Sequence, residues 1–183
     1  MSDPAYLRNL KEYSRAQFGT EYETEAVVGD LDDESDRTAI LVAATAIEDA
    51  LEQALMQRMP ALATDNDARV KVFGPEGTIS TYSAKILIAY AIGILDRKAR
   101  KEIDVVRHIR NACAHSRKSL SLQTPALADA IKGALGEDVV AKLRDQEPAT
   151  LRRAFICHIA ALIYQVLSGK RIPIWGLIEK LSE

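Results

Sequence analysis

The sequence predicts an all-α protein, a helical bundle of about six to eight helices in a single domain. Apolar residues recur at helical spacing through most of the chain, and residues that start or stop helices punctuate it. No stretch alternates apolar and polar residues as a half-buried strand would. The chain has 183 residues, of which 48% are hydrophobic and 27% charged. A chain of this length can bury most of its apolar surface without disulfides or metals.

The N-terminal part is expected to hold one helix and an acidic arm. The letters SDP place a capping residue and a proline at the start of a helix from about Pro4 to Phe18. The stretch from Glu21 to Asp36 then contains eight acidic residues and no basic one. We therefore divide the chain into residues 1–30, an N-terminal helix and acidic arm, and residues 31–183, the helical domain.

The domain is expected to open with a long amphipathic helix that Pro60 ends. Its core stripe follows helical spacing and consists of Ile40, Ala44, Ile47, Leu51 and Leu55. The letters FGPEGTIS, residues 73–80, predict a turn-rich loop, after which Ser80 or Thr81 caps the next helix. Residues 86–95 carry no charge, so we expect a central buried helix there.

The second half of the chain predicts four more helical segments. The first covers residues 98–115, and the next has Thr124 as cap, Pro125 at its first position and Gly136 as stop. A short helix is expected over residues 137–144. A second mostly buried helix starts near Pro148 and stops at Gly169, and Pro173 opens a short terminal segment.

Cysteine usage and the apolar runs indicate a cytoplasmic protein. Cys113 and Cys157 make no disulfide framework, which favours a reducing compartment. The first residues do not resemble a signal peptide, and the apolar runs fall short of the roughly 18 residues that span a bilayer. We expect no cofactor and no metal, because the Cys-His pairs lack chelating spacing. His158 lies within an apolar helix and is expected to be a core residue.

A basic segment stands out in a chain whose net charge is −2. Residues 97–118 contain eight Lys or Arg against Glu102 and Asp104. Such a segment can mark an anion-binding surface or form a solvated helix face. The binding residues that we select from it are Asp104, Arg107, His108, Arg117 and Lys118.

The letters RNACAH, residues 110–115, contain the polar side chains that are the best candidates for catalysis or binding. At 100° per residue, one face of this helix is apolar and holds Val105, Val106, Ile109, Ala112 and Cys113. Asn111 and His115 lie four residues apart and stack, whereas Arg110 and His115 are about 140° apart and diverge. They can converge only if the helix frays at His115 or if a symmetric second copy supplies one of them.

Two readings of this motif remain open. A histidine can exchange a proton with a ribose hydroxyl, and an arginine can stabilise charge on a phosphate, so Arg110, Asn111 and His115 suit phosphodiester cleavage. Alternatively, Asn111 and His115 cap the helix end and bond nearby backbone.

The chain resembles the mannitol operon repressor (MtlR) family over roughly residues 35–125. The likeness begins with Arg37, Glu48 and Leu51 and continues through FGPEGTISTYSAKILIAYAIGIL. The matching positions in that stretch are Gly74, Pro75, Ser80, Thr81, Ser83, Lys85, Ile86, Ala89, Tyr90 and Gly93. The resemblance implies an all-helical fold and a regulatory role.

RNACAH separately resembles the Arg-Asn-x-x-x-His signature of HEPN domains, which are helical bundles that often dimerise. Some of them are metal-independent RNases, and this resemblance implies catalysis by Arg110 and His115 with support from Asn111. Others are antitoxins, adaptors or regulators without catalytic activity.

We therefore expect a non-enzymatic regulatory homodimer of the MtlR type that acts through contacts with a protein partner. The alternative is a HEPN-type endoribonuclease with RNA as substrate. DNA is not an expected partner, because we find no helix-turn-helix pattern and the net charge is negative. No membrane association is expected.

Overall fold

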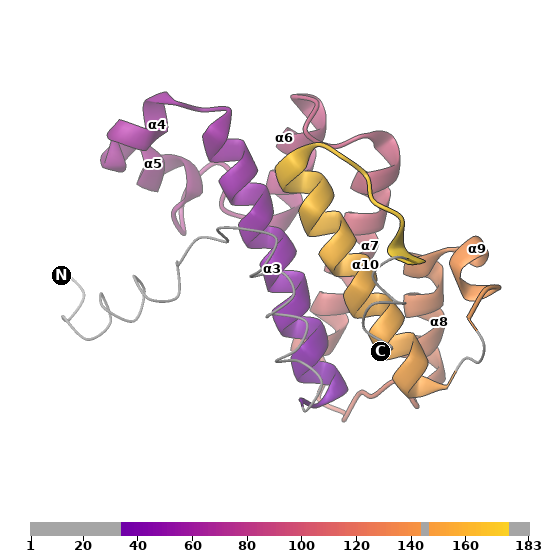
Figure 1. Ribbon diagram of the computed structural model, residues 1–183. Coiled ribbons are helices and arrows are strands. Elements are labelled where there is room, and N and C mark those ends of the chain that lie inside the picture. The colour runs from indigo at the N-terminus through magenta and orange to yellow at the C-terminus, as the bar shows by residue number, and fades with distance from the viewer. Residues whose placement is uncertain (1–33, 144–146, 176–183) are drawn as a thin grey trace.

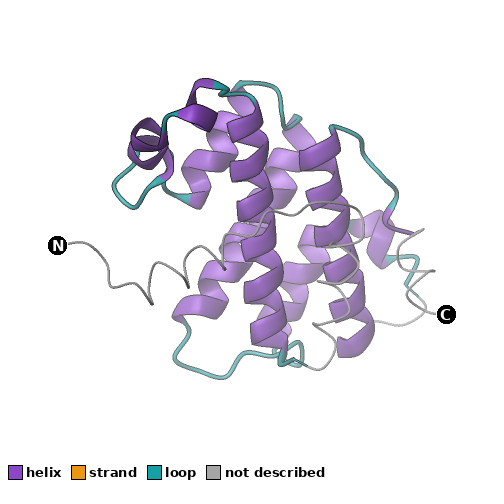
Figure 2. Ribbon diagram, turned by 60° about the vertical axis from the view of Figure 1, so that its left-hand side comes forward, coloured by secondary structure: helices purple, strands orange, loops and turns teal. Residues whose placement is uncertain are grey.

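The computed structural model describes residues 34–143 and 147–175, and in these ranges it consists of helices joined by loops (Figures 1 and 2). The helices are α3 (Asp36–Gln57), α4 (Ala61–Thr64), α5 (Asn66–Phe73), α6 (Tyr82–Ala91), α7 (Arg97–His115), α8 (Pro125–Leu135), α9 (Glu137–Val140) and α10 (Pro148–Ser168). The predicted all-α bundle is confirmed. The expected helix at residues 4–18 and all but the end of the acidic arm lie outside the described residues.

Five of these helices form two layers. α3 and α10 run side by side, and α6, α7 and α8 lie behind them in Figure 1. α7 is central, because it packs against α3, α6 and α8. This arrangement leaves one long side of α7 facing solvent.

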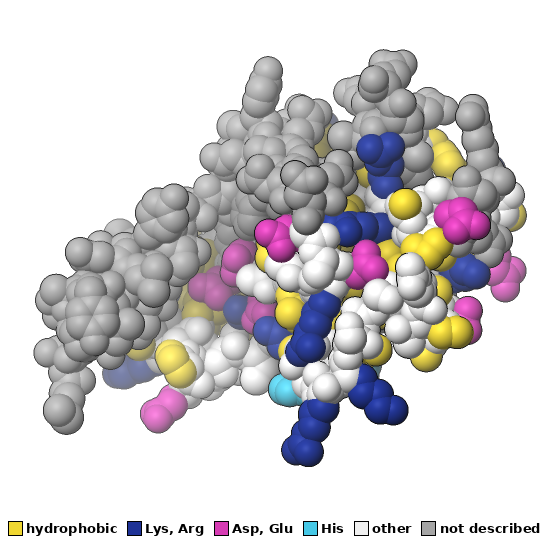
Figure 3. Space-filling view, turned by 90° about the horizontal axis from the view of Figure 1, so that it is seen from below, with side chains coloured by type: hydrophobic (Ala, Val, Ile, Leu, Met, Phe, Trp, Pro, Cys, Tyr) yellow, Lys and Arg dark blue, Asp and Glu magenta, His cyan; other side chains and the backbone are white. Residues whose placement is uncertain are grey.

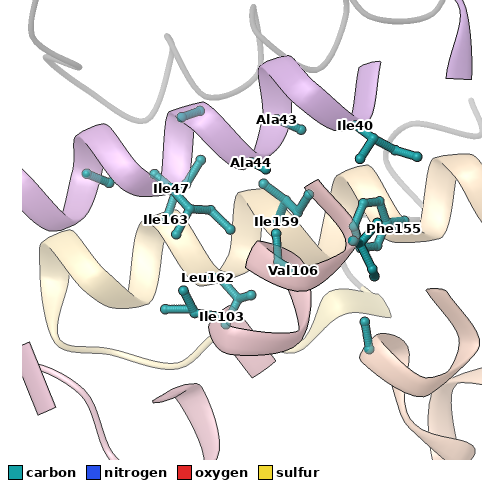
Figure 4. Packing of buried hydrophobic residues seen from close by; sticks show 14 of the residues in the cluster. Ile40, Ala43, Ala44, Ile47, Ile103, Val106, Phe155, Ile159, Leu162 and Ile163 are labelled. Carbon is teal, nitrogen blue, oxygen red and sulfur yellow. The ribbon is translucent and has the colours of Figure 1, made fainter. Parts of the chain in front are cut away.

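The core lies between the two layers (Figure 4). Every residue of the predicted α3 stripe is buried, with Ile47, Leu51 and Leu55 fully enclosed. α10 supplies the facing side chains, and Figure 4 shows Phe155, Ile159, Leu162 and Ile163 meeting those of α3 and α7. Burying one such side chain contributes about 1.5–3 kcal/mol to folding.

Capping residues set several of the helix ends. The Ser35, Thr81 and Asp96 side chains accept hydrogen bonds from backbone N–H groups in the first turns of α3, α6 and α7. Gly136 ends α8 and Gly169 ends α10, as predicted. Thr124 stands at the N-cap position of α8, although its side chain makes no capping bond there.

The structure differs from the prediction in three places. The short helix expected over residues 137–144 is only one turn long, because α9 ends at Val140. Sequence patterns did not indicate α4 and α5, whose described residues are all at least partly exposed. The apolar stretch 86–95 is not one buried helix. α6 ends at Ala91, and Gly93 adopts a left-handed φ of 78°, which lets the Ile94 and Leu95 N–H groups donate to the Ala89 carbonyl. Leu87 and Ile92 remain 53% and 42% exposed.

α10 is long and apolar enough to pass a length-and-composition test for a membrane span. Most of it is buried against the other helices, which is also the property of a core helix in a soluble protein. His158 lies at its centre and is buried, as predicted.

Candidate functional site around helix α7

The buried face of α7 is close to the predicted one. Its buried residues are Val106, Ile109 and Cys113, together with Ala99 and Ile103 from the first turns. Val105 is partly buried. Ala112 is exposed, which corrects the expectation that it belongs to the core. It lies 100° round the helix from Cys113 and so falls on the solvent side of the boundary.

The RNACAH residues diverge within one chain. α7 is helical through His115, so no fraying brings the imidazole back toward Arg110. The two side chains are therefore about 140° apart. Arg110 is half-buried and its Nη1 donates to Oδ1 of Asn111 at 3.2 Å, whereas His115 is exposed.

The helix end is closed by a residue from elsewhere in the chain. Arg37 in the first turn of α3 donates from Nη2 to the Ala114 carbonyl at 3.2 Å. The Ser116 N–H donates to the Ala112 carbonyl. The expectation that Asn111 and His115 cap a buried helix end is thus not what the described contacts show, because Arg37 takes that role.

A polar seam lies between α7, α6 and α3. The central residue of the seam is Tyr82, whose side chain is buried and whose hydroxyl has no hydrogen-bond partner among the described residues. Burial raises the pKa of Tyr82 above its ordinary value, and the negative charge of Glu48 raises it further. The positive charges of Arg110 and Arg107 oppose this effect.

The same seam contains a buried ion pair that sequence reasoning missed. Nζ of Lys85, a residue only 6% exposed, lies 3.2 Å from Oε1 of Glu48 and 2.8 Å from Oε2 of Glu52. Burial alone would lower the pKa of Lys85, but its bond to Glu52 and the charge of Glu48 raise that pKa above its usual value. These contacts fasten α6 to α3. Residues 86–95, which directly follow Lys85, carry no charge, so a search of the sequence for clusters of charged residues does not find this ion pair.

Three of the five predicted binding residues meet on α7. Nε of Arg107 donates to Oδ1 of Asp104 at 2.9 Å, and Nη2 of Arg107 lies 2.9 Å from Nε2 of His108. His108 remains largely exposed. Arg117 and Lys118 are exposed in the loop after α7, beyond His115, which itself lies about 10 Å along the helix from His108. The five residues therefore form two groups and not one site.

Figure 3 views the end of the bundle that holds the loop after α7, and Lys and Arg side chains project from it beside a histidine. Asp36, the last residue of the acidic stretch, is engaged at this end. Its Oδ2 accepts from the Leu122 N–H at 2.9 Å, and its Oδ1 lies 3.4 Å from Nη1 of Arg152 on α10. Asp36 thus holds the loop and α10 together. Its place at the start of a helix, after a capping serine, was the available sequence signal for a structural role.

No family model and no curated protein sequence matches this chain. A solved structure does. The fold is that of MtlR in the X-ray structure of the MtlR–HPr complex from Escherichia coli. The match covers 79% of this chain and 98% of that one, with a TM-score of 0.60 and 13% sequence identity. The chain therefore has an MtlR-like fold, as the sequence resemblance implied. The likeness does not bear on the HEPN-like motif.

Proposed function

We propose that this chain is a non-enzymatic regulatory protein of the MtlR type, which acts in the cytoplasm through contacts with a protein partner. The MtlR-like fold carries this proposal, because the solved structure that shares it is a complex with another protein, HPr. The geometry of α7 supports the same reading. Arg110 and His115 lie about 140° apart on this helix, which argues against a catalytic pair within one chain.

Titration with purified HPr, from Escherichia coli and from the source organism, tests this proposal. We expect saturable binding by calorimetry with a dissociation constant in the micromolar range or tighter, since weaker contacts seldom survive as specific complexes. Lysozyme, a protein with no regulatory role, is the control. If neither HPr binds and no other protein partner can be isolated, the regulatory proposal fails.

We further propose that the protein is a homodimer. A two-fold axis near α7 would set the polar residues 104–115 of one copy against those of its mate. Light scattering at micromolar concentration is expected to give twice the chain mass. A monomer would remove any composite site built from Arg110 of one copy and His115 of another.

A second candidate function is metal-independent RNA cleavage at such a composite site. The observation that favours it is the exposure of His115 next to the cations of residues 117 and 118. Structured RNA incubated with the protein in EDTA should then be cleaved to a 2′,3′-cyclic phosphate, and both Arg110→Ala and His115→Ala should abolish the cleavage. His115 is exposed, so its replacement should cost less than about 0.5 kcal/mol of stability in either case. Intact RNA would rule this candidate out.

A further inference from the structure

Helix α6 exposes an apolar strip that the bundle does not cover. Leu87, which is 53% exposed, and Ala91 one turn further on form this strip, and Ile92, the residue that caps the helix, is 42% exposed about 140° round from Leu87. They belong to the uncharged stretch 86–95, which composition alone would place inside the core. Single exposed apolar residues are ordinary, but adjacent ones on one helix face are typical of a surface that another molecule covers.

The strip borders the junction between α6 and α7. On one flank of α6, Lys85 binds the glutamates of α3. On the opposite flank, Tyr90 meets α7, because the guanidinium of Arg100 lies 4.7 Å from the centre of its ring. Leu87 is three residues from Tyr90, about 60° round the helix, and Ala91 lies one turn beyond Leu87. The strip therefore opens toward solvent on the α7 side.

The neighbouring part of α7 presents a basic border, formed by Arg97, Arg100 and Lys101. All three residues are exposed. Two carboxylates lie beside these cations in the sequence: Asp96 accepts a hydrogen bond from the Ala99 N–H at 2.7 Å as the N-cap, and Glu102 lies 2.8 Å from Arg171 and 3.9 Å from Lys98. No ion pair within the described residues neutralises Arg97 or Lys101.

We propose that the apolar strip and the basic border together form the docking surface for an acidic protein partner, one that presents apolar side chains rimmed by carboxylates. Apolar contacts at the centre with complementary charges at the edge are the usual anatomy of a protein interface. This inference rests on the proposed function, since it names the surface and the partner chemistry through which a regulatory contact would form.

The surface suits a protein better than RNA or a second copy. Single-stranded nucleic acid binds on exposed aromatic rings, and the ring at this surface, Tyr90, is covered by Arg100. In a symmetric dimer built on this surface, the basic border of one copy would lie close to the basic border of the other copy, and like charges repel. An acidic partner meets neither obstacle.

Site-specific photo-crosslinking in the source cells tests the surface. A benzoylphenylalanine at position 87 is compared with one at position 70, because Leu87 and Val70 are both 53% exposed, while Val70 belongs to α5. We expect a protein adduct from position 87 and little or none from position 70. Mass spectrometry identifies the partner, which should carry an acidic patch at the crosslinked segment. An adduct with RNA, an adduct with a second copy, or equal adducts at both positions overturns the proposal.

The identified partner is then purified and titrated against variants of the full chain. We expect Leu87→Asp to weaken binding about tenfold or more and Lys101→Glu to weaken it several-fold, with a smaller effect at high salt. The matched controls are Val70→Asp and Arg153→Glu, the latter at an exposed arginine of α10. Circular dichroism confirms folding, and Lys101→Glu keeps the test valid if Leu87→Asp misfolds. If both variants bind the partner as tightly as the wild type does, this surface is refuted but the regulatory proposal stands. The absence of any partner refutes both.

Discussion

The buried histidine of α10 makes the stability of this protein depend on pH. His158 is 2% exposed, and its Nε2 atom has no hydrogen-bond partner among the described residues. Burial lowers the pKa of His158 from 6.5 to about 4, and the positive charges of Arg171 and Lys98 act in the same direction. Protonation in the folded state is therefore unfavourable.

The direction of the effect follows from proton uptake by the two states. Between pH 6.5 and 4 the unfolded chain binds a proton at this position and the folded chain does not, so stability falls as the pH falls. At about 1.4 kcal/mol per pKa unit, the full loss is about 3 kcal/mol, of which about 2 kcal/mol should already be gone at pH 5. Above pH 6.5 the contribution is complete.

Urea denaturation at pH 7, 6 and 5 measures this loss. The wild-type free energy of unfolding should drop by about 2 kcal/mol over that range relative to His158→Leu, a variant that cannot take up the proton. His108→Leu, at a largely exposed histidine, is the matched control for the substitution itself. If His158→Leu retains the wild-type slope, burial of this imidazole is not the source of the pH dependence.

Three further predictions concern charged groups. Lys85→Met leaves two half-buried glutamates without their cation, so chemical denaturation should show a loss of about 3 kcal/mol, and a loss below 1 kcal/mol would contradict the buried ion pair. Asp36→Ala removes the acceptor that holds the loop after α7 and should cost about 2 kcal/mol, with faster amide hydrogen exchange in that loop; unchanged exchange would count against the contact. Desolvation by the surrounding helices raises the pKa of Asp49 from 3.8 to about 6, although the residue itself is exposed; Lys85 opposes this effect, and the charges of the neighbouring glutamates add to it. The stability that a neutral Asp49 provides is therefore lost as the pH rises through 6. Asp49→Asn should stabilise the protein by less than about 1 kcal/mol at pH 7 and should have no such effect at pH 4. Equal effects at both pH values would refute this.

Much of the fold could be predicted from local patterns. The α3 stripe, the helix over residues 98–115 and the glycine stops at 136 and 169 each follow from helical periodicity or from the conformational freedom of glycine, which short windows of sequence reveal. The extent of α6 could not be read in this way. Composition shows that residues 86–95 are apolar, but only tertiary packing decides that one side of them faces the solvent.

The candidate site was harder to predict than the fold. Helix angles correctly separate Arg110 from His115, because a regular helix fixes that angle. Other contacts around α7 and the seam join distant parts of the chain. Arg37 reaches Ala114 across 77 positions, and Lys85 reaches Glu48 across 37. Contacts of this range leave no periodic signal in a single sequence.

The packing of α3 against α10 has a consequence for synthesis of the chain. α3 is the first described helix and α10 is the last long one, so the side of α3 that packs against α10 stays uncovered until α10 has been made. At the usual rates of translation, ribosomes need roughly 6 to 20 seconds to go from Asp36 to Pro148. During that interval the nascent chain leaves open an apolar, alanine-rich side of α3, where chaperones can bind it. A message truncated before the codon for Pro148 would leave that face open permanently and would yield a product prone to aggregation and proteolysis.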